Sequence, residues 1–164
     1  MTNMMQVRYT KNKMNLDNIK EGIVRVGFFE GSKYEGNLSV AQVARWNELG
    51  IGVPKRPFMR PAVHRNKSQL YDRLRSDYKK ALANNTNTMD VLDGFGLLVQ
   101  GLIQNEIINK TYPRNADITI YGGWMKNKKT GKPFYVEGKG KDSPLRNTRV
   151  MLNSVSHQEE EIRK

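Results

Sequence analysis

The sequence contains no cysteine, which excludes two classes of protein. The chain is not a disulfide-stabilised scaffold, and it does not bind a metal ion through thiolates. It also lacks an apolar run near the length of a membrane span, and its mean hydropathy is −0.71, so we expect no membrane partner. Residues 1–13 lack the continuous apolar core of a secretory signal, so we expect no export signal there.

Catalytic and ligand-binding motifs are scarce as well. The sequence shows no Ser/His/Asp or Cys/His set and no phosphate-binding loop ending in Gly-Lys-Ser/Thr. His64 has no second ligand type at metal-binding spacing, so we interpret it as a surface or interface histidine. We therefore expect a protein that is not an enzyme, with no catalytic residue, no cofactor and no metal.

One enzymatic alternative stays open. Asp117, Glu137 and Lys139 resemble the D…E-x-K pattern of magnesium-dependent nucleases. In that pattern two carboxylates on adjacent strands hold Mg²⁺, and the lysine steadies the attacking water or the phosphate. An E-x-K triplet arises often by chance in a lysine-rich chain, so the nuclease is kept only as an alternative.

Acidic side chains are the minority. The chain has 28 lysines and arginines against 16 aspartates and glutamates, a net charge of +12, which predicts an acidic partner such as nucleic acid. Residues 55–80 carry nine basic and two acidic side chains, and residues 110–149 carry ten and three. Six lysines are our candidates for contact with DNA or an acidic partner: Lys126, Lys128, Lys129, Lys132, Lys139 and Lys141.

A second alternative is a free-standing basic DNA-binding module. Trp124, Phe134 and Tyr135 lie between the lysines of the second basic block. Aromatic side chains of this kind can stack on the bases of a single strand. No known reading helix or stacking sheet accompanies them, so this alternative also stays open.

The segment from Val26 to Pro61 carries the densest local signals. Residues 23–29 are apolar, β-branched and aromatic, which predicts a strand. Ser39 with Gln42 has capping-box spacing and predicts a short helix up to Leu49, which Gly50 ends. Residues 54–61 contain three prolines and predict a stiff extended arm.

The apolar pair of this arm, Phe58 and Met59, has two interpretations. The pair packs either into the chain's own core or against a neighbouring subunit. The candidate subunit-interface residues are Trp46, Glu48, Pro54, Arg56, Pro57, Phe58, Met59 and Arg60.

Two long helices and a hairpin are predicted downstream. Apolar residues at helical spacing indicate helices over residues 61–83 and 89–109. Glycines 94, 96 and 101 in the second helix indicate either close approach of another helix or a kink. Asp117–Tyr121 alternates in strand fashion and is predicted to pair with Pro133–Val136 in a hairpin with a basic tip.

The order of these motifs resembles a family of tailed-bacteriophage virion proteins. The first motif is VGFFEG-x-Y, followed by the short helix that ends in NELG and by RPFMRP before a long helix. Two later motifs are GFGLLVQGLIQNEI and KDSPLRNTRVMLNSV. These are the tail completion or virion morphogenesis proteins of the head–tail junction, and the resemblance covers about residues 23 to 155. Arg149 stands where a glycine is common in the family.

The resemblance implies an α+β fold, with a small twisted antiparallel sheet, one or two long helices packed on it and a basic β-hairpin. Independently of the resemblance, a length of 164 residues without a low-complexity linker predicts one domain over residues 1–164, whose ends at 1–20 and 156–164 are expected to be flexible or to bridge subunits. From the resemblance, copies are expected to form a ring of about six at the neck of the virion, assembled in the host cytoplasm. Its expected partners are itself, other head–tail proteins and passing double-stranded DNA without sequence readout.

Overall fold

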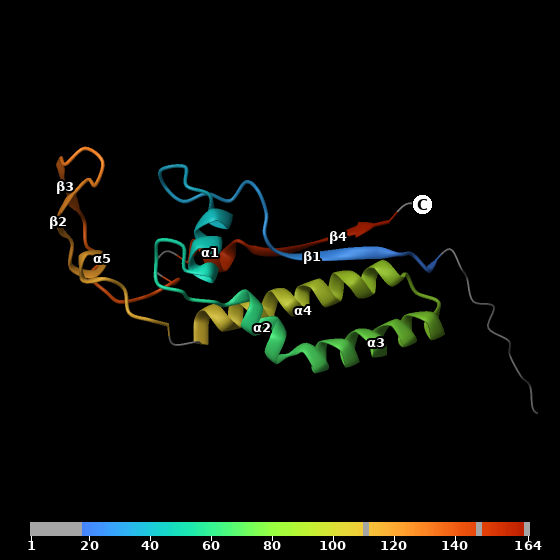
Figure 1. Cartoon of the computed structure of the whole chain (residues 1–164). Coiled ribbons are helices and arrows are strands. Elements are labelled where there is room, and N and C mark those ends of the chain that lie inside the picture. Colours follow the sequence, from blue (N-terminus) through green and yellow to red (C-terminus); the bar gives the residue numbers. More distant parts are fainter. Residues whose placement is uncertain (1–17, 110–111, 147–148, 163–164) are drawn as a thin grey trace, which may run out of the picture.

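The computed structural model describes residues 18–109, 112–146 and 149–162, which form an α+β fold (Figure 1). The helices are α1 (Val40–Leu49), α2 (Met59–Arg65), α3 (Lys67–Asn84), α4 (Thr88–Asn109), α5 (Asp117–Tyr121) and α6 (Val150–Asn153). The strands are β1 (Gly22–Phe28), β2 (Gly123–Lys126), β3 (Pro133–Val136) and β4 (Val155–Glu161). No helix among these residues is both long and apolar enough to cross a lipid bilayer.

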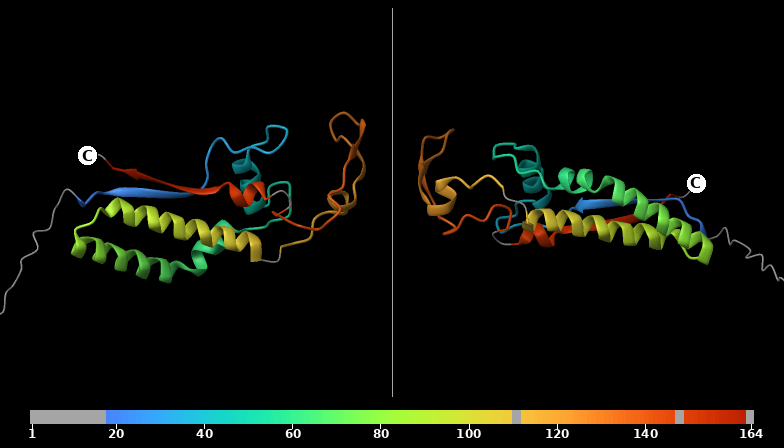
Figure 2. Two further views of the ribbon diagram at one scale, coloured as in Figure 1. Left: turned by 180° about the vertical axis from the view of Figure 1, so that it is seen from behind. Right: turned by 90° about the horizontal axis from the view of Figure 1, so that it is seen from below.

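Helix α4 is the centre of the molecule. The β1–β4 ribbon lies along one side of α4, and helices α2 and α3 pack on it from another (Figure 2). The buried apolar side chains of α4 that join these layers are Leu92, Val99, Ile103 and Ile107. The predicted combination of a small antiparallel sheet with two long helices is therefore confirmed.

The ribbon joins the two ends of the described chain. Strands β1 and β4 are antiparallel, with Gly22 opposite Glu161 and Phe28 opposite Val155. Ion pairs Arg25–Glu160 and Lys20–Glu161 cross between the two ends. Residues 156–161 are therefore not a flexible arm, because the main chain of β4 is bonded to β1, and their contact with another subunit stays a prediction. Residues 1–17 lie outside the described part.

Local signals correctly located helix α1. The Ser39 hydroxyl accepts a hydrogen bond from the backbone amide of Gln42 at 3.5 Å, and the helix ends at Gly50 with φ of 77°. A left-handed residue at this point lets the Gly50 amide bond back to the Trp46 carbonyl. Strand β1 and helix α4 also lie where the pattern predicted them.

The single helix predicted over residues 61–83 is two helices. Helix α2 ends at Arg65 and α3 begins at Lys67, with Asn66 between them at φ of −102°. The side-chain amide of Asn66 donates to the carbonyl of Ala62, and this local bond competes with the helical ladder. A break at one residue redirects the chain while preserving the apolar stripe on both sides of it.

Asp117–Tyr121 is a helix, so the strand prediction there is wrong. Asp117 lies in the first turn of α5, where its carboxylate forms a 2.6 Å ion pair with Arg114. Its negative charge also interacts favourably with the positive end of the helix dipole. The partner of β3 is instead β2, which pairs Trp124 with Tyr135 and Met125 with Phe134. Strand β3 and the basic tip are as predicted, whereas the first strand of the hairpin lies within the segment predicted as its loop.

Two glycine-related positions in the fold have clear roles. A Cβ atom on Gly96 would lie 2.6 Å from the His157 ring and 2.7 Å from Val24, so Gly96 marks the close approach of the ribbon to α4. The glycines of this helix were predicted to mark either the approach of another helix or a kink; at Gly96 the element that approaches is the β1–β4 ribbon. Arg149 has φ of 56°, a left-handed conformation, and directly precedes α6.

Candidate functional site

Residues 113–143, which we call the appendage, form a largely exposed unit. They contain α5, β2 and β3 and lie at the end of the molecule opposite the C-terminus (Figures 1 and 2). The appendage carries seven basic and three acidic side chains. It is therefore a basic projection from the helical body.

The hairpin of the appendage exposes large apolar side chains on both faces. Trp124 and Tyr135 lie opposite each other, 73% and 59% exposed, with ring centroids 5.5 Å apart in an edge-on arrangement. Met125 and Phe134 form the next pair and point to the other face, at 41% and 44% exposure. A two-stranded hairpin with no covered face is at most marginally stable alone, which favours a partner at this surface.

The lysines predicted to contact DNA or an acidic partner lie around this hairpin. All six are exposed, and within the described residues none of their ammonium groups forms an ion pair. The tip that presents them is ordered: the Asn127 carboxamide oxygen accepts from the backbone amides of Lys129 and Thr130, at 2.9 and 3.2 Å. Lys139 and Lys141 lie on the segment that returns to the body.

Arg56 anchors the appendage to the body. Its guanidinium is buried and donates to the carbonyls of Pro113 at 3.0 Å and Arg114 at 3.2 Å. It also donates to the side-chain oxygens of Asn115 and Asn47. Burial lowers the pKa of Arg56, while the charge of Asp142 acts in the opposite direction. The rigid fork of an arginine suits this task because its donors reach several acceptors at once.

Asp142 closes the base of the appendage. Its carboxylate accepts from the backbone amide of Asn115 at 3.0 Å and lies 3.9 Å from the Arg114 guanidinium. The segment that enters the appendage at Asn115 is thereby joined to the segment that leaves it at Asp142. A hydrogen bond to Asp117 is the main cause that raises the pKa of Arg114, so this guanidinium stays charged. Sequence reasoning did not single out Asp142, because its partners lie 27 or more residues away.

The residues predicted at a subunit interface divide into three groups. Glu48, Arg56 and Phe58 are buried within the chain, so their assignment to an interface is corrected: their side chains are occupied by intrachain contacts. Trp46, Pro57 and Met59 are half-buried. Pro54 and Arg60 are exposed and stay predictions.

Glu48 explains why this segment folds inward. Its carboxylate accepts hydrogen bonds from the backbone amides of Phe58, Met59 and Arg60, at 2.7, 3.0 and 3.1 Å. It thus caps the first turn of α2 from the end of α1. Phe58 is then placed against Phe28 of β1, with ring centroids 5.9 Å apart. Of the two interpretations of Phe58, packing into the chain's own core is the one the structure shows.

A cleft of about 530 Å³ lies where the body and the appendage meet. It is lined from the body by residues including Tyr34 and Pro54 and from the appendage side by Thr119 and Lys139. Burial raises the pKa of Tyr34, so its hydroxyl is neutral at neutral pH. The cleft is open and places Lys139 beside apolar walls, without a nucleophile–base pair among its lining residues.

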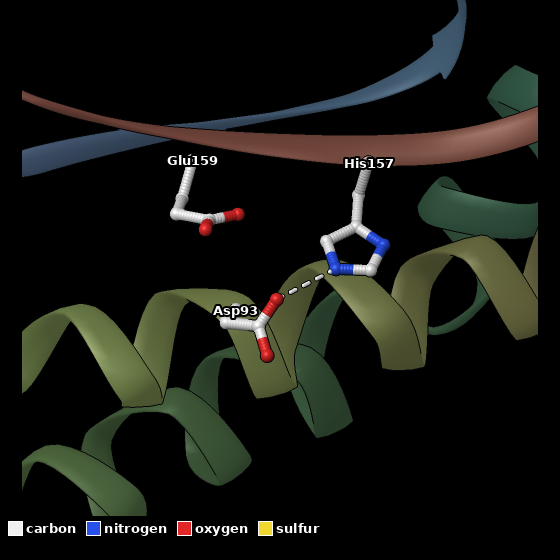
Figure 3. Close-up of side chains that lie close together, drawn as sticks. All are labelled: Asp93, His157 and Glu159. Carbon is white, nitrogen blue, oxygen red and sulfur yellow. Dashed lines mark hydrogen bonds and ion pairs between the residues drawn. The ribbon is translucent and has the colours of Figure 1, made fainter.

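The premise of the nuclease alternative is not met. Asp117 lies on helix α5 and is paired with Arg114, whereas the D…E-x-K pattern requires it on a strand beside the one that bears Glu137. Among the described residues one group of three metal-capable side chains lies close together, and it contains neither Asp117 nor Glu137. That group is Asp93 on α4 with His157 and Glu159 on β4 (Figure 3).

Sequence reasoning did not find this group. The imidazole of His157 and the carboxylate of Asp93 are brought together from positions 64 residues apart, by the packing of β4 on α4. The i, i+2 spacing of His157 and Glu159 in a strand was the one local signal for it. Compared with protein-family models, curated proteins and solved structures, the chain matches none of them.

Proposed function

We propose that this chain is a structural subunit of the virion of a long-tailed bacteriophage, where copies form a ring at the head–tail junction through which DNA passes. The order of sequence motifs from residue 23 to residue 155 supports the family assignment. The observation that carries the role of a building block is the appendage, whose hairpin leaves apolar side chains exposed on both faces.

The hairpin has the composition of a protein–protein contact. Trp, Tyr, Phe and Met are enriched at the centres of interfaces, and Trp and Tyr dominate their energetics. Trp124, Tyr135, Phe134 and Met125 supply all four residue types on eight strand residues. Burying side chains of this size against a partner stabilises a complex by about 1.5–3 kcal/mol per fully buried residue.

The shape of the molecule suits a closed ring. The appendage lies at one end and the helical body extends away from it, so the surface at one end differs from that at the other (Figure 1). Repetition of one contact between unlike surfaces generates a ring when the rotation closes. In the proposed ring the hairpin of each copy contacts the body of the next.

The charge of the chain supports passage of DNA through such a ring. Each copy carries a net charge of +12, and the six exposed lysines of the appendage are without ion-pair partners in the described structure. Copies arranged around a channel add their fields, and lysines attract phosphates whatever the base sequence. The protein would then guide the genome without reading it.

Removal of the gene from a phage that carries it tests this proposal. We expect filled heads and separate tails in electron micrographs of the lysate, because the joining ring would be missing. Complementation with the wild-type gene should restore joined particles. Joined, infectious particles from the deletion strain would contradict the proposal.

A double variant then tests the hairpin. Trp124→Ser with Phe134→Ser removes one exposed apolar side chain from each face, so the isolated chain should keep its fold and lose complementation. Tyr71→Ser is the matched control, because Tyr71 is an aromatic residue 65% exposed on α3. Loss of complementation by the control to the same extent would show that the hairpin has no special role.

A second candidate function is single-strand binding by the isolated chain. It is favoured by one observation, the exposed Trp124 and Tyr135 rings beside the basic tip. Base stacking on such rings is worth about 1–3 kcal/mol per base. Binding of a single-stranded oligonucleotide with a strong salt dependence, abolished by Trp124→Ser, would support it; no binding at low salt would dismiss it.

A further inference from the structure

His157 of β4 lies over helix α4 with an oxygen atom facing each of its ring nitrogens. Nε2 is 2.9 Å from an oxygen of Asp93, and Nδ1 is 2.7 Å from the carboxamide oxygen of Gln100 (Figure 3 shows the Asp93 contact). A neutral imidazole carries one N–H and donates to only one of two such acceptors. Both oxygens are satisfied either by a second proton on the ring or by a metal ion held between Nε2 and Asp93, with the N–H at Nδ1.

Glu159 brings a second carboxylate to the same place. Alternate residues of a strand share a face, so Glu159 projects toward α4 beside His157. The ligand atoms of Asp93, His157 and Glu159 all lie within 4.8 Å of one another. Two carboxylates and an imidazole are therefore gathered at the surface, where His157 is 16% and Asp93 58% exposed.

Lysine and arginine do not pair with these two carboxylates in the described part of the chain; the basic group beside Asp93 is His157. The next two glutamates do form such ion pairs: Glu160 pairs with Arg25 and Glu161 with Lys20. Although the chain has 28 lysines and arginines, this pair of carboxylates faces an imidazole instead.

Helix α4 is shaped to hold the imidazole in this orientation. Asp93, Gly96 and Gln100 follow one another at spacings of three and four, so they lie on one face of the helix. Gly96 makes room for the ring, because a Cβ atom there would lie 2.6 Å from Cδ2 of His157. Gln100 holds Nδ1, which directs Nε2 toward the carboxylates, as outer partners do for metal-ligating histidines.

We propose that Asp93, His157 and Glu159 form a Zn²⁺ site that links the C-terminal strand to helix α4. An imidazole nitrogen selects zinc over magnesium or calcium, which prefer oxygen alone. Adjacent ligands at about 2.1 Å from a tetrahedral zinc lie roughly 3.4 Å apart, so the 2.9 Å between His157 and Asp93 needs only a small adjustment. Water completes the coordination, and the bound ion joins strand β4 to helix α4 at the surface of the protein.

The test uses the full chain without an affinity tag, treated with a chelator, desalted and titrated with ZnCl₂ by calorimetry. We expect one zinc per chain and a zinc-dependent rise in the thermal unfolding midpoint. Asp93→Asn, His157→Gln and Glu159→Gln should each weaken binding by at least about tenfold and remove that rise. MgCl₂ should give neither effect.

Two matched controls separate this site from adventitious binding. His64→Gln removes the other histidine of the chain, and Glu160→Gln removes the neighbouring carboxylate that points to the opposite face of the ribbon. Both should bind zinc as the wild type does. Circular dichroism and the urea midpoint without zinc verify that each variant is folded; if His157→Gln is not, the exposed positions Asp93 and Glu159 carry the test.

Three outcomes would overturn the proposal. The first is the absence of saturable zinc binding by the wild-type chain. The second is equal affinity in the wild type and in folded Asp93→Asn and Glu159→Gln. The third is the same loss of affinity in the His64→Gln control, which would place the bound ion elsewhere.

Discussion

The carboxylate of Glu48 accepts a 2.7 Å hydrogen bond from the backbone amide of Phe58. This contact joins the end of α1 to the start of α2 and fixes the ring of Phe58 against Phe28. Both Glu48 and Phe58 are buried, so the segment that looks like an external arm in the sequence is part of the core. The appendage and the surface around Pro54 and Arg60 are exposed and open to a partner.

Replacement of Glu48 by glutamine should destabilise the chain. Glutamine has the same shape but one neutral acceptor oxygen in place of a charged carboxylate that serves three amides. We expect the free energy of unfolding to fall by about 1–3 kcal/mol, measured by urea denaturation. Glu35→Gln, at an exposed position, is the control; equal midpoints for the two variants would disprove the capping role of Glu48.

Replacement of Arg56 by lysine should loosen the base of the appendage. A lysine keeps the charge but cannot reach the carbonyls of Pro113 and Arg114 and the side chain of Asn115 together. Amide hydrogen exchange in residues 113–119 should accelerate at least about tenfold, while helices α3 and α4 stay protected.

Arg60→Lys is the matched control for this measurement, because the Arg60 side chain is 67% exposed. It should leave exchange in the appendage unchanged. If Arg56→Lys also leaves it unchanged, the anchor lies elsewhere, and the Asp142 contact with Asn115 would be the next one to remove.

Two glycine substitutions in α4 should have opposite signs. Gly101→Ala adds a methyl group in open space and should stabilise the chain by up to about 1 kcal/mol through helix propensity. Gly96→Ala would press on His157 and Val24 and should destabilise it by about 1–3 kcal/mol, as the ribbon is pushed from the helix. Thermal or urea unfolding of the two variants checks this; a stabilised Gly96→Ala chain would show that the ribbon does not pack there.

Stability should fall in alkali because of Tyr112. Burial is the main cause that raises its pKa, with the nearby Glu106 carboxylate adding to it, and its hydroxyl donates to the Glu106 carbonyl at 3.0 Å. Above about pH 10 the unfolded chain loses a phenolic proton that the folded chain keeps, so the free energy of unfolding decreases as pH rises.

The expected contribution of Tyr112 is a slope of about −1.4 kcal/mol per pH unit above pH 10, where the unfolded state binds one proton fewer. Urea unfolding of the wild type and of Tyr112→Phe between pH 8 and pH 11 measures it. The phenylalanine variant should show a shallower decline. An identical slope in both proteins would mean that Tyr112 ionises equally easily in the folded state.

Local signals predicted the elements whose causes are local. Ser39 and Gly50 mark the two ends of α1 through their own backbone conformations, and the apolar stripe of α4 defines that helix. The strand prediction for Asp117–Tyr121 was wrong because it used a local signal alone. β-Branched residues in alternation favour a strand, but the ion pair of Asp117 with Arg114 and the burial of Ile120 favour one helical turn. Tertiary contacts override propensity in so short a segment.

Strand β4 could not be predicted from local sequence, because the residues that stabilise it lie far from it in the chain. Its sequence, VSHQEEE, is poor in residues that favour strands, and its position depends on pairing with β1 and on ion pairs such as Arg25–Glu160. The same distance hid the grouping of Asp93 with His157. In the appendage, the lysine-rich tip was visible in the sequence, whereas the exposure of Trp124 and Phe134 depended on the true hairpin register.

The most direct test of the proposed role measures whether the hairpin is covered in a phage particle. The natural chain has no cysteine, so Met125→Cys creates a single thiol on the hairpin. A maleimide should label it rapidly in the isolated chain, and labelling in intact particles should be slowed at least about tenfold until the particles are denatured. Equal labelling in the intact particle, or absence of the chain from it, would contradict the account.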